Sequence, residues 1–414
     1  MPDYLMHPSK RILGTVSKEL LGKSVLLGVT GSVSIYKSID LARTLMRRGG
    51  EVRVIMSQEA TKLISPEMFK WATGEEVVIE LTGELEHVEL AEESDGFLIA
   101  PATANTLVKL AQGIADSPLV ATALNFFGSG KVVAVVPAMH LPMYHSPQVR
   151  RAVIELRNMS VEVIEPDVIG DLAHYPDVDL IASRFVTLML RGRDLQGLKL
   201  VVTAGPTREF MDPVRFLSNP SSGAMGVSIA NEAQFRGADV FLVHGPLSGK
   251  VKSFVKNSVE VQTTEEMLSA VKNLVEKGYR AVILAAAPAD YKFKTVREKK
   301  VESHAEVPTV ELERTPKISS QLRGKAFLVG FSAETADSEE ELIEKAKAKK
   351  ERHGFDLIIA NNVSRRDIGF SSDYNEVVVI GERYTRKLSK DYKYIIAREI
   401  LDIVREELKN KHVV

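Results

Sequence analysis

Cysteine is absent from this chain of 414 residues. That absence excludes disulfides, thiolate metal sites and a cysteine nucleophile. Net charge is nearly absent too, because 54 Lys and Arg residues face 55 Asp and Glu residues and leave a formal charge of -1. A chain without an excess of one sign has no overall field that would attract nucleic acid or a membrane surface.

Long apolar runs are also missing. No run reaches the roughly 18 residues that a transmembrane helix requires. The first residues, which include Asp3, His7 and Pro8, lack the apolar segment of a secretory signal. We therefore expect a cytoplasmic protein that acts on small-molecule substrates and has no nucleic-acid or membrane partner.

The length and patterning of the chain predict more than one domain. A length of 414 residues implies about two or three domains. Residues 191–197 are polar, contain two glycines and separate two complete α/β patterns, so we place a linker there. The predicted domains are residues 1–190 and 198–414.

The first domain begins with a strand, a hydroxyl-rich loop and a helix. Residues 23–28 read as a strand, residues 38–48 have helical spacing, and residues 51–56 alternate as a second strand. The loop between them carries Thr30, Ser32 and Ser34 beside Gly31 but lacks the GxGxxG dinucleotide fingerprint. Such a loop suits the single phosphate of a mononucleotide. A plain turn with capping serines explains it almost as well.

Three further strands are expected in this domain, at residues 95–100, 131–136 and 161–164. Each ends in a small or polar loop, and such loops converge on one crevice of an open parallel sheet. The spacing predicts a flavodoxin-like sheet. His87 lies in a short amphipathic segment that could present it to this crevice, although a lone histidine is more often a surface or packed residue.

The second domain begins with a strand at residues 198–202, a long loop at 203–226 and a helix at 227–235. Loops of this length are usually functional or disordered. Apolar side chains within it favour an ordered, packed loop: Phe210, Met211, Val214, Phe216 and Leu217. Its end, Ser221-Ser222-Gly223, offers hydroxyls and backbone N–H groups to an anion, or serves only as a helix cap.

More α/β units follow this loop. We predict strands at residues 238–244, 259–261, 281–287, 325–330 and 357–360, and an edge strand at 376–380. Helices are predicted at 264–276, capped by Thr264, and at 338–352 and 391–409. A basic run at residues 292–302 follows a strand end, where it could neutralise a triphosphate or form an ordinary charged surface.

Seven segments occur together in the order and spacing of one known family: residues 28–37, 101–106, 137–144, 204–226, 285–300, 330–335 and 356–363. On these segments the sequence resembles the bifunctional phosphopantothenoylcysteine decarboxylase / phosphopantothenate–cysteine ligases of coenzyme A biosynthesis. The resemblance extends from about residue 20 to the C-terminus. It implies an α/β protein with a flavodoxin-like (Rossmann-like) flavoprotein domain followed by a second Rossmann-like ligase domain.

The resemblance implies an FMN site in the first domain, formed by Gly31, Ser32, Ser34, Ser57, Asn105, Thr106, Ala115 and Asp116. His87 matches the histidine of the family's active site. Loss of CO2 from an acylated cysteine needs an electron sink, which the flavin supplies. In the family, the flavin oxidises the thiol side to a thioaldehyde before CO2 is lost, and then returns a hydride.

Two positions depart from the family pattern. His140 stands in the motif at residues 137–144 where asparagine is usual, and His174 stands where the family uses a cysteine as proton donor. Imidazolium has a suitable pKa for that donation, so we hypothesise that His174 replaces the cysteine. The sequence does not decide which residue gives this proton.

The second domain resembles the ligase, which uses CTP to activate 4'-phosphopantothenate as an acyl-cytidylate that cysteine then attacks. Asn219 matches the residue that handles the acyl-cytidylate, and Lys300 matches the catalytic lysine. Nucleotide-contacting positions are matched by Ser221, Ser222, Gly223, Ala285, Ala286, Asp290, Pro316, Lys317, Ile318, Phe331, Lys349 and His353. Mg2+ is implied with the triphosphate, without identified protein ligands. CTP is not distinguished from ATP by the sequence alone.

Two other functions fit part of the sequence. One joins a flavin prenyltransferase-like domain to an unrelated nucleotide-binding domain, which leaves Asn219, Asp290 and Lys300 unexplained. The other is a regulatory binding protein without turnover, which the changes at His140 and His174 keep open for the first domain. The family also implies a homo-oligomer, with a trimer-based decarboxylase core and ligase dimers that could build a dodecamer.

Overall fold

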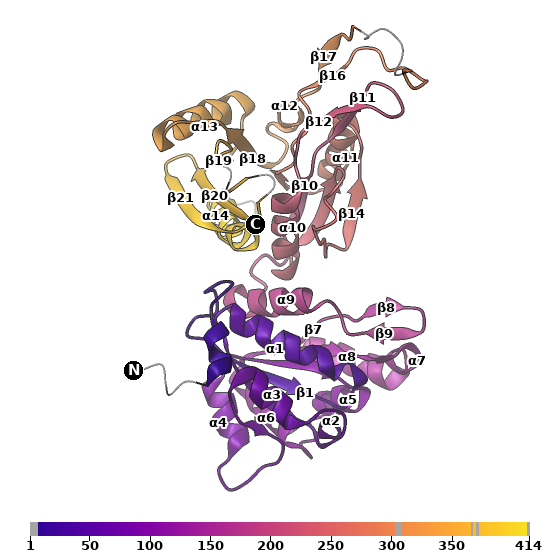
Figure 1. The fold of residues 1–414 in the computed structure, drawn as a ribbon, viewed down its shortest axis with the longest axis vertical. Coiled ribbons are helices and arrows are strands. Elements are labelled where there is room, and N and C mark those ends of the chain that lie inside the picture. The colour runs from indigo at the N-terminus through magenta and orange to yellow at the C-terminus, as the bar shows by residue number, and fades with distance from the viewer. Residues whose placement is uncertain (1–6, 303–308, 366, 370–371, 412–414) are drawn as a thin grey trace. The chain divides into compact units, whose positions relative to one another are not determined.

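The computed structural model describes residues 7–302, 309–365, 367–369 and 372–411. The chain divides into two compact units, Met1–Gly192 and Arg193–Val414, and each is described by itself. Figure 1 shows both units as sheets flanked by helices. The mixed α/β fold class predicted from the sequence is confirmed.

Unit 1 is built on a six-stranded parallel sheet in the order β3-β2-β1-β4-β5-β7. Its strands are β1 (Ser24–Val29), β2 (Glu51–Met56), β3 (Val77–Val78), β4 (Gly96–Ala102), β5 (Val132–Pro137) and β7 (Glu162–Val163). If the two-residue strand β3 is set aside, the order is that of flavodoxin. Almost every residue of β1 and β4 is buried, as expected for a parallel sheet covered on both faces.

Helices cover both faces of this sheet. Apolar residues of α1 (Lys37–Arg47), α3 (Pro66–Thr73) and α9 (Val178–Arg191) share one buried cluster with the sheet. Those of α4 (Glu86–Glu93), α5 (Ala104–Gln112), α6 (Pro118–Ser129) and α8 (Pro147–Asn158) form the cluster on the other face. Short helical segments complete the unit: η2 (Pro8–Ile12), η3 (Val33–Tyr36), α2 (Gln58–Thr61) and α7 (Leu141–Tyr144).

A small antiparallel sheet, which the sequence analysis missed, follows β5. Its order is β6-β9-β8, from β6 (Met139–His140), β9 (Leu172–His174) and β8 (Asp167–Ile169). The hydrophobic pattern gives little warning of it, because strands of two and three residues are too short to show an alternation.

Unit 2 is built on an eight-stranded sheet in the order β14-β13-β10-β15-β18-β19-β20-β21. The first six strands run parallel in the Rossmann order: β10 (Lys199–Ala204), β13 (Asp239–His244), β14 (Asn257–Glu260), β15 (Ala281–Leu284), β18 (Phe327–Glu334) and β19 (Leu357–Asn362). Strands β20 (Tyr374–Ile380) and β21 (Thr385–Tyr392) are antiparallel.

Helices α10 (Ala224–Phe235) and α14 (Lys393–Asn410) cover one face of this sheet. Helices α11 (Thr264–Glu276), α12 (Ile318–Leu322) and α13 (Glu339–His353) cover the other face. The residues of α13 are mostly charged, and only Leu342 and Ala346 are buried. These two pack against residues of β19 and β20.

Three details of unit 2 differ from the sequence prediction. The residue that caps α11 is Thr263, whose hydroxyl accepts from the N–H of Glu266, and not Thr264. Strand β20 is not an edge strand, because β21 pairs with it on the outer side. The closing helix therefore begins at Lys393 and not at Asp391. Strand β21 was missed because its run of alternating charges and hydroxyls has little apolar content, which is common at an exposed sheet edge.

Two hairpins form an arm, which we define as residues 208–218, 291–302 and 309–314. Strand β11 (Arg208–Phe210) pairs with β12 (Phe216–Ser218), and β16 (Tyr291–Phe293) pairs with β17 (Leu312–Arg314). Figure 1 shows these strands together at one end of unit 2. The hairpins are joined by hydrogen bonds, including one from the N–H of Arg297 to the carbonyl of Met211 (2.9 Å).

The arm corrects the expectation that the apolar residues of the 203–226 loop are buried. Val214, Phe216 and Leu217 are all exposed, with fractions of 55%, 43% and 37%. The ring of Phe216 lies against Phe210 and under the guanidinium of Arg208, which orders the hairpin without covering it. Other exposed apolar residues of the arm are Tyr291, Val296, Val310 and Leu312.

None of the described helices has both the length and the apolar content that a helix needs to cross a bilayer.

Candidate functional site

The main candidate site of unit 2 is a crevice at the carboxyl ends of β10 and β15. Strand order reverses between these strands, and open α/β sheets bind ligands at such a switch point. The crevice encloses about 310 Å³, and Thr203 from β10 and Leu284 from β15 are part of its wall. That volume is in the range of small-molecule sites.

The first turn of α10 forms one side of the crevice. Gly223 caps this helix with φ +81°, a backbone conformation that glycine adopts without strain. A Cβ at Gly226 would lie 2.7 Å from the carbonyl oxygen of Thr203, so only glycine lets the helix approach the end of β10 this closely. The N-terminus of α10 therefore brings its partial positive charge to the crevice, where the hydroxyls of Ser221 and Ser222 accept from the N–H groups of Gly223 and Ala224.

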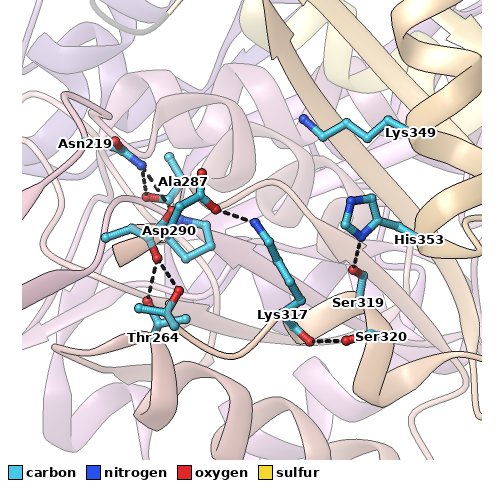
Figure 2. A network of polar contacts seen from close by, with 12 residues as sticks. Asn219, Thr264, Ala287, Asp290, Lys317, Ser319, Ser320, Lys349 and His353 are labelled. Atoms are coloured by element: carbon cyan, nitrogen blue, oxygen red, sulfur yellow. Dashed lines mark hydrogen bonds and ion pairs between the residues drawn. The ribbon is translucent and has the colours of Figure 1, made fainter. Parts of the chain in front are cut away.

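Asn219 ties the loop before α10 to the loop after β15. Its Nδ2 donates to the carbonyls of Ala287 (3.2 Å) and Pro288 (3.1 Å), as Figure 2 shows. Because these bonds use both amide protons, the group that Asn219 can offer a ligand is its amide oxygen, an acceptor for N–H or O–H donors.

A buried polar cluster holds the residue that precedes Asp290. The Thr207 hydroxyl accepts from the N–H of Ala289 (2.9 Å), and the Thr315 hydroxyl donates to the Ala289 carbonyl (2.7 Å). Glu209 lies beneath them and accepts from the N–H (2.9 Å) and hydroxyl (2.7 Å) of Thr264. All these groups are buried, so the cluster fixes this wall of the crevice.

Charged side chains of the loop after β15, of Lys317 just before α12 and of α13 also line the crevice. Asp290 pairs with Lys317, as Figure 2 shows. Lys349 pairs with Glu334 (3.1 Å). Burial alone would raise the pKa of Glu334, but the Ser332 hydroxyl and the Lys349 charge outweigh it and lower that pKa. The Nδ1 of His353 lies 3.2 Å from the Ser319 hydroxyl. Burial and then the charges of Lys317 and Lys349 lower the pKa of His353, which favours the neutral ring at pH 7.

The structure brings most of the predicted ligase residues to this crevice. Its wall includes Asn219, Ser221, Ser222, Gly223, Ala285, Ala286, Asp290, Lys317, Ile318, Phe331, Lys349 and His353. Pro316 is next to this wall but is not part of it among the described residues. Lys300 is not brought there either: it is exposed on the arm, beside Val301, whose N–H donates to Asp212 (3.2 Å).

Several residues of the wall had no place in the sequence analysis. They include Thr203, Met225, Ser319, Phe355, Asn361, Asn375 and Lys393. Asn361 and Thr203 are at the ends of parallel strands, a position that could have signalled them. Asn375 and Lys393 had no such signal, because they lie in the antiparallel strand β20 and at the start of α14, a region that was predicted incompletely.

In unit 1 the polar loops meet at the carboxyl edge of the sheet. The Thr30 hydroxyl donates to the carbonyl of Pro101 (2.8 Å) and accepts from the N–H of Thr103 (3.1 Å), so it links the loops after β1 and β4. A Cβ at Gly31 would lie 2.7 Å from that of Glu59, which shows how closely the β1 loop approaches α2.

The other predicted flavin-site residues lie on these loops. Ser32 caps η3 by accepting from the N–H of Ser34, and Ser57 caps α2. Thr106 is buried in the first turn of α5, while Asn105 is exposed there. Ala115 and Asp116 are exposed after α5, where Asp116 pairs with Lys109 (2.7 Å). The loops after β1, β2 and β4 thus come together, and the Ala115–Asp116 pair remains at their margin.

The three candidate histidines occupy two places. His87 is in the first turn of α4, and its Nδ1 is buried without a hydrogen-bond partner among the described residues. His140 pairs with Leu172 across β6 and β9, and His174 is two residues beyond Leu172. Side chains two residues apart in a strand share a face, so His140 and His174 project from the same face of the small sheet as diagonal neighbours.

These features fit a phosphorylated, planar cofactor at the carboxyl edge of unit 1. The capping hydroxyls and helix starts at Ser32, Ser57 and Thr103 offer anion-binding groups. The unpartnered Nδ1 of His87 is a buried polar atom that a ligand could satisfy. Fold and sites together define a two-domain α/β protein with a separate small-molecule site in each domain.

Comparison with known proteins identifies the family. Residues 13–189 match the family model described as flavoprotein, and residues 195–408 match that of the DNA/pantothenate metabolism flavoprotein C-terminal domain. The chain is 42% identical over 412 residues to the coenzyme A biosynthesis bifunctional protein CoaBC of Thermococcus kodakarensis, covering 98% of this chain and 100% of that protein. It is 34% identical over 412 residues to the CoaBC protein of Escherichia coli K12, covering 95% and 99%.

A solved structure is similar to part of the chain. It is the C-terminal domain of a coenzyme A biosynthesis bifunctional protein CoaBC, 35% identical, with a TM-score of 0.44, and the match covers 53% of this chain and 99% of that one. The relatives of nearly full length and the two family models establish the family. The chain belongs to the family of coenzyme A biosynthesis bifunctional proteins, and the resemblance stated from the sequence is confirmed.

Proposed function

We propose that this protein carries out two consecutive steps of coenzyme A biosynthesis. Unit 2 joins 4'-phosphopantothenate to cysteine at the expense of CTP, and unit 1 decarboxylates the 4'-phosphopantothenoylcysteine that results to 4'-phosphopantetheine. The observation that carries the proposal is the unit 2 crevice, where Asn219, the start of α10 and the cations Lys317 and Lys349 line one cavity.

In the ligation, a carboxylate oxygen of the acid attacks the α-phosphorus of CTP, and pyrophosphate leaves. The cysteine amine then attacks the acyl carbon, and CMP leaves. Ser221, Ser222 and the start of α10 would bind phosphate oxygens, since a helix N-terminus favours anions. The amide oxygen of Asn219 would accept a hydrogen bond from an N–H or O–H group of the acyl substrate.

Lys300 is proposed as the cation that stabilises charge on the α-phosphate and carboxylate oxygens in the transition state. Removal of one such group typically costs about 10²–10³ in rate. The experiment measures CTP-dependent pyrophosphate release with phosphopantothenate and cysteine, for the parent and Lys300→Gln. Equal rates would refute the role of Lys300, and no release by the parent would refute the ligase activity.

For the decarboxylation we propose that FMN is held by Gly31, Ser32, Ser34, Ser57, Asn105, Thr106, Ala115 and Asp116. Bound FMN supplies the electron sink that the loss of CO2 requires. His87 would hold the substrate carboxylate through its imidazole, whose Nδ1 has no hydrogen-bond partner among the described residues. His140 and His174, which share a face of the small sheet, would move the final proton, with His174 as the donor.

Absorption and product analysis test this second activity. The parent should be yellow or bind added FMN, and should convert 4'-phosphopantothenoylcysteine to 4'-phosphopantetheine. His174→Ala should still lose CO2 but accumulate the unsaturated thiol, because the proton donor is gone. If His174→Ala completes the reduction at the parent rate, His174 is not the donor. A protein that stays colourless with added FMN has no flavin activity.

Further parts of the proposal concern the metal, the assembly and the compartment. Mg2+ would accompany the triphosphate and neutralise part of its charge. The exposed apolar side chains of the arm support contact between copies in a homo-oligomer. We propose that the protein works in the cytoplasm.

A further inference from the structure

A buried lysine that the sequence analysis did not single out lines the unit 2 crevice. Lys393 is the first residue of α14, belongs to the wall of the crevice and is only 6% exposed. Its ammonium donates one hydrogen bond within the described residues, to the carbonyl of Gly369 (2.7 Å). An ammonium carries three protons, so two remain for another partner.

Among the described residues, Asp373 places a negative charge close to Lys393, while the groups that line this end of the crevice are positive or neutral. The sulfur of Met225, in the first turn of α10, lies 3.7 Å from Nδ2 of Asn375. Both residues line the crevice together with Lys393, so the starts of α10 and α14 lie at this end of it. Both helix starts carry partial positive charge. Asn361 and Asn375 add amide groups here. The carboxylate in the wall is that of Asp290, which Lys317 already pairs.

This arrangement is unfavourable in the unliganded protein and would become favourable when an anion binds beside the ammonium. Burial lowers the pKa of Lys393 to about 8, against the opposing charge of Asp373. A buried ammonium without a paired carboxylate is costly, and a bound anion would supply the missing charge. Phosphate groups are the anions that substrates of the proposed ligase would carry into this crevice.

We propose that Lys393 is a substrate-binding residue whose ammonium contacts a phosphate group of a ligand bound in the unit 2 crevice. The inference rests on the proposed ligase function for its ligands, and it names a residue that neither the motifs nor that function had assigned. The phosphate could belong to the nucleotide or to phosphopantothenate, which have the same chemistry at this point.

Calorimetric titration of the full chain tests the proposal. The variant Lys393→Met keeps the length of the side chain and removes the charge. The probes are CTP, CMP, inorganic pyrophosphate, 4'-phosphopantothenate and pantothenate. We expect Lys393→Met to weaken binding of the phosphate-bearing ligand about 10- to 100-fold, the effect of losing a charge-assisted hydrogen bond. Lys393→Arg should restore part of the lost affinity.

The ligand pairs distinguish the source of the phosphate. If Lys393→Met loses affinity for CTP and pyrophosphate while its affinity for CMP is little changed, Lys393 contacts the outer phosphates of the nucleotide. If the variant loses affinity for phosphopantothenate while its affinity for pantothenate is unchanged, Lys393 contacts the phosphate of phosphopantothenate. The matched control is Lys390→Met, because Lys390 precedes the same helix and pairs with Asp367 outside the crevice (2.8 Å). It should bind every probe like the parent.

A purely structural role gives a different result. If Lys393→Met lowers the melting temperature but weakens all probes equally, or weakens none, the proposal is overturned. If the parent binds neither CTP nor phosphopantothenate, the proposed ligase function fails, and the pyrophosphate titration still tests Lys393. Parent and Lys393→Met binding pyrophosphate equally in that case would overturn the inference as well.

Discussion

Single side chains at the unit 2 crevice have competing effects on folding and on binding. Lys393 is buried with one hydrogen bond, and Asp290, Lys317 and Lys349 carry charges into the same cavity. Groups arranged for a ligand in this way usually reduce the stability of the free protein. The cost should be measurable residue by residue.

Lys393 predicts a pH dependence of stability. Its pKa is about 8 in the folded protein, whereas an unperturbed lysine, which approximates the unfolded chain, has a pKa of 10.5. Between these values the unfolded state binds more protons, so the parent gains stability as pH rises through this window, and the penalty is fully present below pH 8. The difference between the two pKa values corresponds to at most about 3 kcal/mol.

Urea unfolding of parent and Lys393→Met at pH 7.5 and pH 10.5 measures this effect. The parent should gain up to about 3 kcal/mol relative to the variant between the two pH values. A difference between the two proteins that does not change with pH would show that the ammonium is not desolvated in the folded state.

Thr264 gives a second test, because its hydroxyl donates a hydrogen bond to the buried carboxylate of Glu209, in the cluster that holds the loop before Asp290. Thr264→Val leaves that carboxylate with fewer donors, which should cost about 1–3 kcal/mol and raise the KM for the nucleotide. Thr264→Ser retains the hydroxyl and should behave like the parent in thermal unfolding and in the ligation assay. Equal behaviour of Val and Ser variants would exclude this role of the hydroxyl.

Among the secondary-structure elements, helix α10 and strand β10 depend most on close approach. A Cβ at Gly226 would lie 2.7 Å from backbone and side-chain atoms of β10, which cannot give way as a flexible side chain can. Gly226→Ala should therefore displace α10, destabilise unit 2 by about 1–3 kcal/mol and abolish tight CTP binding.

Gly249→Ala is the matched control for Gly226→Ala. A Cβ at Gly249 meets nothing within 4 Å, so this variant should fold and bind CTP like the parent. Circular dichroism on heating and calorimetric titration with CTP give both readouts. Unchanged CTP affinity in Gly226→Ala would show that the helix start does not hold the nucleotide.

The elements show which parts of the fold a sequence can predict. The parallel strands were predictable because they are continuous apolar runs that end in small or polar loops, and strand β2 was found with its bounds unchanged. The family resemblance implied roles for Asn219, Asp290 and Phe331, which the structure places on the crevice wall.

Short antiparallel pieces were not predictable on the same grounds. Strand β21 is mostly charged, and the hairpin of β11 and β12 puts apolar side chains on the outside, so a hydrophobic pattern misassigns both. Lys393 was missed for that reason: its place beside the crevice depends on how β20, β21 and α14 return across the sheet.

For the whole molecule, the arm raises the question of how Lys300 reaches a crevice. Lys300 is exposed on the arm and is not part of the described crevice wall. The arm also exposes Phe216, Leu217 and Leu312, an apolar surface that a second copy could cover. We therefore predict that Lys300 acts in the crevice of a neighbouring copy.

Co-expression of Lys300→Gln with Asn219→Ala tests this prediction. Each variant alone should be nearly inactive in ligation. In mixed two-fold dimers one crevice has both residues intact, so random mixing should restore about a quarter of the parent activity. No recovery from purified mixed dimers would show that Lys300 serves the crevice of its own chain.

The most direct measurement for the two proposed activities uses the full chain with 4'-phosphopantothenate, cysteine, CTP, Mg2+ and FMN, followed by mass spectrometry. The account predicts 4'-phosphopantetheine, CO2, CMP and pyrophosphate, with no product when CTP is omitted. Accumulation of 4'-phosphopantothenoylcysteine without CO2 would contradict the role given to unit 1. Failure to consume CTP would contradict the role given to unit 2.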